Sequence, residues 1–134
     1  MLNSSPGSAM RADPVAAVLD TVALARLEEL DPTRANDLLG RVLKAFQSSA
    51  ARLMPQLESA RLAADHATVR LVAHTLKSSS ASIGALALAA ECARVETLIR
   101  EGTLDGLPAA IDAMTVAMNT ALQAIAHLLE RRAC

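Results

Sequence analysis

The chain has 134 residues and a formal net charge of −1, with one phenylalanine and no tryptophan or tyrosine. A chain of this length is expected to form one domain around a single core. The balanced charge and the lack of basic runs or aromatic platforms exclude a nucleic-acid-binding protein that works by neutralising phosphates. Alanine and leucine dominate while β-branched and aromatic residues are few, so the composition favours helix over sheet.

Cysteine content and the N-terminal segment indicate the compartment. Cys92 and Cys134 make a poor disulfide framework, and we expect both thiols to be reduced. The opening segment MLNSSPGSAM lacks the charged-then-apolar layout of a signal peptide, and no apolar run approaches transmembrane length. We therefore expect a cytoplasmic protein that does not bind a membrane.

The first predicted helix follows a segment rich in serine, glycine and proline. Residues 1–12 have that composition and predict a flexible leader, followed by a helical domain at 13–134. Asp13 can cap a helix whose first turn contains Pro14, and the helix is predicted to continue to about Leu30.

The second helix is predicted after the Asp-Pro-Thr break at 31–33, with Thr33 as its cap. Its apolar stripe has steps of three and four and contains Leu39, Val42, Phe46, Ala50, Leu53 and Leu57. Pro55 removes a backbone hydrogen bond and clashes with the carbonyl of Ala51. A kink, or two helices in series, is therefore expected.

Three more helices complete the chain. Asp65 can cap a helix over residues 66–83, which Gly84 can end in the left-handed conformation. Further helices are predicted over residues 86–100 and from about 107 to 131. Four long amphipathic helices with short loops predict an all-α fold, an antiparallel up-and-down four-helix bundle with a short extra N-terminal helix.

A histidine lies on the polar face of the helix predicted at 66–83. His74 points away from the apolar stripe, and Arg70 and Lys77 lie one turn before and after it, with roughly 5–6 Å between Cβ atoms. The two cations favour a neutral imidazole with a lone pair free to attack, and they can stabilise an anion such as phosphate. Ser78 is small and can donate a hydrogen bond. Spacing by itself also fits an ordinary solvated histidine.

The surrounding sequence is more specific than the spacing. The segment VAHTLKSSSASIGA at 72–85, followed by LAAECARVETLIREG at 88–102, resembles the histidine-containing phosphotransfer (HPt) family. The shared pattern is a histidine, a lysine three positions later, then a small residue, and an Ile-Gly-Ala turn. The likeness covers most of residues 14–131 and includes Asp65, Cys92 and Glu96. The small residue is most often glycine in the family and is Ser78 here.

The resemblance and helix geometry together suggest roles for the residues on this face. It implies that His74 is the reversible phosphoryl acceptor and that Lys77 steadies the phosphate. Helix geometry adds Ser78 and Arg70 as phosphate-stabilising residues. The small residues Ala67 and Ala81 are expected to belong to the surface on which a partner docks.

The resemblance also implies a histidine phosphotransfer protein of a two-component phosphorelay. A receiver-domain aspartate of a hybrid histidine kinase or response regulator would supply the phosphoryl group, and another receiver would remove it. The chain has no Gly-rich phosphate loop, and Thr75 stands where self-phosphorylating kinases usually have an acidic residue. We expect a monomeric phosphoryl carrier without kinase activity or a cofactor of its own, with Mg²⁺ on the receiver.

Two further expectations concern which ring nitrogen of His74 is phosphorylated and how far the protein extends. Nε2 of His74 is favoured sterically because it is the more distal nitrogen. The leading methionine and the caps at both ends favour a free-standing relay protein over a domain of a hybrid kinase.

The sequence also fits a non-catalytic helical-bundle adaptor that binds a partner protein, which is the alternative to a relay protein. A metal site is not expected, because His66 and His74 lie about 80° apart around their helix and no Glu-x-x-His pair exists. Outside the proposed site, Glu96 is predicted to pair with Arg100 at the four-residue spacing, and Cys92 to be a small core residue.

Overall fold

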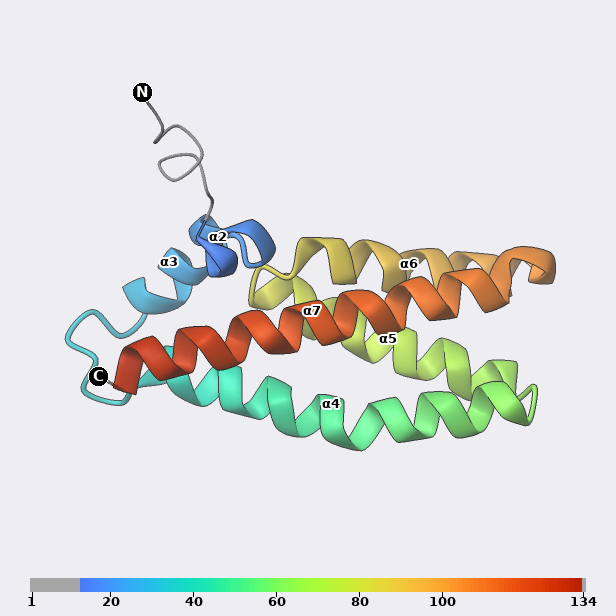
Figure 1. Ribbon diagram of the computed structural model, residues 1–134, viewed down its shortest axis with the longest axis horizontal. Helices are drawn as coiled ribbons and strands as arrows, with labels where there is room; N and C mark the ends of the chain where they lie inside the picture. The colour runs from blue at the N-terminus through green and yellow to red at the C-terminus, as the bar shows by residue number, and fades with distance from the viewer. Residues whose placement is uncertain (1–12, 134) are drawn as a thin grey trace, which may run out of the picture.

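The computed structural model describes residues 13–133, and the regular secondary structure in that range is entirely helical. The elements in chain order are α2 (Pro14–Val18), α3 (Thr21–Glu29), α4 (Leu38–Leu62), α5 (His66–Ser82), α6 (Leu86–Glu101), the 3₁₀ turn η1 (Leu104–Gly106) and α7 (Leu107–Ala133). Figure 1 shows α4 to α7 alongside one another, each running opposite to the one before, with α2 and α3 at one end. The predicted all-α class is confirmed.

The predicted flexible leader at residues 1–12 lies outside the described residues, and so does Cys134, which was predicted to be a reduced thiol.

Within residues 13–133, no helix has the length and apolar character that crossing a bilayer requires.

The N-terminal segment forms two short helices, so the single helix predicted to about Leu30 is wrong. Asp13 caps α2 by accepting from the backbone N–H of Val15 at 3.0 Å, as predicted. Asp20 then caps α3 by accepting from the N–H of Ala23 at 3.1 Å. Leu19, between the helices, is extended and fully buried. A second capping aspartate next to a core leucine therefore starts a new helix.

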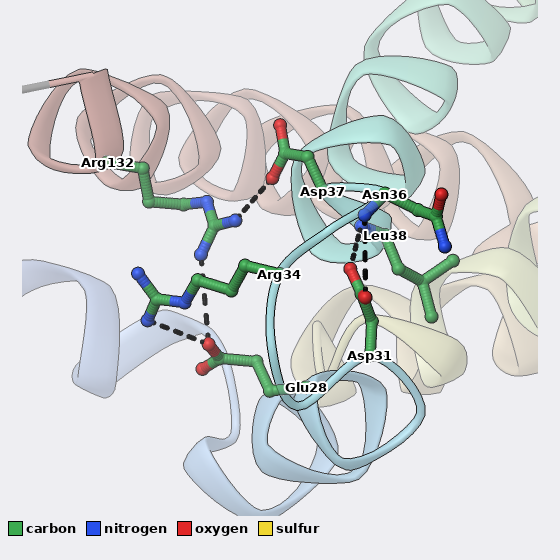
Figure 2. Close-up of polar contacts among 7 residues, drawn as sticks. All are labelled: Glu28, Asp31, Arg34, Asn36, Asp37, Leu38 and Arg132. Carbon is green, nitrogen blue, oxygen red and sulfur yellow. Dashed lines mark hydrogen bonds and ion pairs between the residues drawn. The ribbon is translucent and has the colours of Figure 1, made fainter.

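The start of α4 lies five residues after its predicted cap at Thr33. Asp37, at the N-cap position, has left-handed backbone geometry and makes no side-chain cap. The carboxylate of Asp31 caps the helix from a distance instead (Figure 2). It accepts from the backbone N–H of Leu38 at 3.0 Å and of Asn36 at 3.5 Å. The Asp-Pro-Thr break thus supplies the capping group, but through its aspartate.

Charged side chains tie this connection to the end of α7 (Figure 2). Arg132, whose side chain is 15% exposed, lies 2.5 Å from a carboxylate oxygen of Asp37 and 3.8 Å from one of Glu28. Glu28 also pairs with Arg34 at 3.0 Å. The final turn of α7 therefore fixes the segment between α3 and α4.

Pro55 lies inside α4, which continues past it as one helix, so the prediction of two helices in series is wrong. The apolar side of α4 is buried through Leu39, Leu43, Phe46, Ala50, Leu53 and Leu57. Val42, predicted on this stripe, is only half-buried. Packing along the whole helix stabilises it against the loss of one backbone hydrogen bond, and the proline ring itself is exposed.

The core lies between the four long helices. α7 contributes Met114 and Met118, both fully buried, and α6 contributes Cys92. Burial raises the pKa of the Cys92 thiol to about 12, with Glu96 and Glu91 adding to the effect. Cys92 is therefore a protonated core residue, as predicted, and a poor nucleophile.

Both ends of α5, the helix that contains His74, are fixed by specific residues. Asp65 caps the start of α5 by accepting from Thr68, as predicted. At the other end Gly84 has a φ of +79°, and its carbonyl accepts from the backbone N–H of Asp20 at 2.8 Å. A Cβ on Gly84 would lie 2.7 Å from that nitrogen. This contact admits only glycine and joins the α5–α6 turn to the start of α3.

Gly84→Ala is expected to lower the free energy of unfolding by about 2–4 kcal/mol, through left-handed strain combined with the backbone clash. Gly102→Ala is the matched control: its φ is +72°, but nothing lies within 4 Å of an added Cβ. We expect it to cost about 1 kcal/mol. Urea unfolding followed by circular dichroism measures both, and equal losses would contradict the role given to the Asp20 contact.

Candidate functional site

His74 lies near the middle of α5 on its solvent side. Its side chain is 61% exposed. The opposite side of the helix is buried through Val69, Val72, Ala73, Leu76 and Ser80, followed by Ile83 at the helix end. The predicted orientation of His74 is confirmed, and the ring is open to a partner.

Glu96 of α6 is hydrogen-bonded to this ring. Its Oε2 lies 2.8 Å from Nδ1 of His74, and its side chain is only 10% exposed. The predicted Glu96–Arg100 pair is wrong, because the close packing of α5 on α6 directs the carboxylate toward α5. The sequence offered a signal for this: Glu96 borders the apolar stripe of α6, next to Val95 and four residues after Cys92.

The same carboxylate holds Lys77. The distance between Lys77 Nζ and Glu96 Oε1 is 2.6 Å. The Lys77 ammonium is the main influence that lowers the pKa of Glu96, followed by the hydrogen bond from His74, while desolvation opposes both. Glu96 is therefore ionised at neutral pH and bridges the histidine and the lysine.

The bridge defines the tautomer of His74. A carboxylate only accepts hydrogen bonds, so Nδ1 must carry the hydrogen that it shares with Glu96. In the neutral ring, Nε2 then has the free lone pair. The ring is oriented by the Nδ1–H hydrogen bond, with its other nitrogen available for chemistry.

The other predicted site residues share the exposed side of α5, and within residues 13–133 none of them makes a hydrogen bond or ion pair with His74. Arg70, Ser78, Ala67 and Ala81 are all exposed. Within residues 13–133, no ion pair of Arg70 and no side-chain hydrogen bond from Ser78 to His74 is present. Of the two cations predicted beside the ring, Lys77 pairs with Glu96 through its ammonium group.

An apolar residue on this face was missed by the sequence analysis. Leu71, one turn before His74, is 64% exposed. Helical periodicity places Leu71 about 60° from His74 around the helix. A leucine at that position lies outside the apolar stripe, and this was the signal that could have identified it as an exposed apolar residue.

No group of three or more His, Cys, Asp or Glu side chains that could hold a metal ion is found between residues 13 and 133. The side chains at the site are an oriented imidazole, a carboxylate and an ammonium group. These groups suit nucleophilic attack by Nε2 and stabilisation of an added anion.

Comparisons with known proteins agree with this chemistry. Residues 41–131 match the model of the Hpt domain family, and the chain belongs to that family. The chain is also similar to the crystal structure of histidine-containing phosphotransfer protein B (HptB) from Pseudomonas aeruginosa PAO1. The identity is 28% and the TM-score 0.77, over 87% of this chain and 97% of that one. A search of curated protein sequences found no match.

Glu96→Gln is expected to reduce stability near neutral pH and to matter less in acid. The pKa of Glu96 in the folded protein lies below its usual value of 4.5, so its ionic contribution is complete above about pH 4.5. That contribution is lost as the pH falls through the folded-state pKa. Urea unfolding of both proteins from pH 3 to 7 tests this, and a stability difference that does not change with pH would contradict it.

Proposed function

We propose that His74 is the phosphoryl acceptor of this chain. Membership of the Hpt domain family makes the protein a histidine phosphotransfer protein of a phosphorelay. One observation supports the choice of His74 above all: its exposed ring is held at Nδ1 by Glu96, which leaves Nε2 free on the side open to a partner.

In the proposed reaction, Nε2 attacks the phosphorus of an aspartyl phosphate on a receiver domain. A nitrogen–phosphorus bond forms, the bond from phosphorus to the aspartate oxygen breaks, and its electron pair stays on the receiver's carboxylate. Nδ1 keeps its hydrogen throughout, and Glu96 stabilises the positive charge that develops on the ring, as the aspartate of a catalytic triad does. A second receiver aspartate later takes the group by the reverse chemistry.

The cations and the small side chains of α5 have distinct proposed roles. Lys77 stabilises the phosphoryl oxygens on Nε2, and Arg70 and Ser78 lie one turn away on either side of His74, where they contact those oxygens or the partner. Ala67 and Ala81 have small, exposed side chains, so a receiver can approach the backbone of α5 closely at these two positions.

The remaining features of the proposal concern the protein as a whole. The domain spans 13–134 as an antiparallel up-and-down four-helix bundle with extra N-terminal helices, and acts as a cytoplasmic monomer. Its partners are receiver domains of a hybrid histidine kinase, a response regulator or both. It carries the phosphoryl group without kinase activity, and the receiver supplies Mg²⁺.

His74→Gln is expected to abolish phosphoryl transfer from a phosphorylated receiver, because glutamine has no nucleophilic nitrogen. His127→Gln is the control, since His127 is an exposed histidine on α7 and should leave transfer unchanged. Incorporation of ³²P from the labelled receiver measures transfer, and the label should be acid-labile and alkali-stable. Labelling that persists in His74→Gln would refute the assignment, and no labelling of a folded wild-type chain by several receivers would favour the adaptor.

A further inference from the structure

Lys77 has two possible anionic partners at the site. In the structure its Nζ lies 2.6 Å from Oε1 of Glu96, whose other oxygen accepts from Nδ1 of His74 at 2.8 Å. Lys77 is also one turn after His74, so its long and flexible side chain can reach a group attached to Nε2. Its side chain is 38% exposed, which leaves room for that movement.

Lys77 and Glu96 form a close ion pair whose lysine side is partly exposed. Oε1 of Glu96 is buried, and Nζ of Lys77 lies 2.6 Å from it. The flexible Lys77 side chain reaches that oxygen from a partly exposed position, so its ammonium can turn toward a second anion. A phosphoryl group carries more negative charge and three strong acceptor oxygens, so it competes well for the same ammonium.

We propose that Glu96 is a positioning residue that holds Lys77 in the unphosphorylated protein and releases it to the phosphoryl group on His74. The proposal rests on the function proposed above. Breaking the Lys77–Glu96 pair offsets part of the stabilisation that Lys77 gives to phosphohistidine. The phosphoryl group is consequently held less tightly and passes more readily to the next receiver.

The Glu96→Gln substitution separates the two roles of Glu96, which are to orient the His74 ring and to hold the Lys77 ammonium. Its amide oxygen can still accept from Nδ1–H of His74, so the ring stays oriented. Its side chain has no charge to hold the ammonium, so Lys77 can interact with the phosphoryl group without breaking an ion pair. Removing Lys77 should therefore weaken phosphohistidine more in the glutamine background than in the wild type.

The test is a double-mutant cycle on the equilibrium of phosphoryl exchange with one receiver domain. Four proteins are compared: the wild type, Lys77→Ala, Glu96→Gln and the double variant. We expect Lys77→Ala to lower the His74-to-aspartate phosphoryl ratio about threefold to tenfold more in the Glu96→Gln background. Arg94→Ala, an exposed cation on α6, is the control and should have the same effect in both backgrounds.

Equal effects of Lys77→Ala in the two backgrounds would overturn the proposal while leaving His74 as the acceptor. A wild type that takes no phosphoryl group, or one still labelled after His74→Gln, would overturn the proposed function and this inference with it. Circular dichroism checks that each variant is folded. Lys77→Gln in place of Lys77→Ala preserves the length of the side chain and measures the same coupling if the alanine variant is unstable.

Discussion

The packing of α5 against α6 is the constraint on which the site depends. It places a largely buried carboxylate, Glu96, beneath an exposed histidine, at 2.8 Å from Nδ1. A buried carboxylate needs partners for its charge, and His74 and Lys77 are those partners. One side chain therefore orients the His74 ring, sets its tautomer and holds the ammonium group of Lys77.

The rest of the fold keeps these two helices in register. Gly84 forms the turn between them, and its carbonyl is bonded to the start of α3. Asp65 caps the start of α5, and the apolar sides of α4 and α7 complete the core beneath the site. Stability thus comes from the buried sides of the helices, while the side of α5 that carries His74 is exposed.

The sequence predicted the helical class, the bounds of α5 to within a residue, and the outward orientation of His74, because helical periodicity and caps are local signals. Prediction from the sequence failed where a helix boundary depends on a residue outside that helix or on burial in the core. The cap of α4 comes from Asp31, seven residues before Leu38, and α2 and α3 are divided by the burial of Leu19.

Glu96 shows the same limit at the site. Its neighbours on α6 made Arg100 an obvious partner, whereas the observed partners lie 22 and 19 positions earlier, across a helix–helix contact. The family resemblance included Glu96 but assigned it no role. Pairing between residues on two helices depends on how each helix is rotated about its own axis relative to the other. The periodicity of one helix does not determine that relative rotation.

The central claim is that Glu96 holds Nδ1 of His74 and leaves Nε2 as the phosphorylated nitrogen. Phosphorus-31 and nitrogen-15 NMR of the phosphorylated, ¹⁵N-labelled protein tests it most directly, because coupling to phosphorus identifies the modified ring nitrogen. The account predicts coupling at Nε2 of His74, with hydrogen retained on Nδ1. Phosphorus coupled to Nδ1, or found on a residue other than His74, would contradict it.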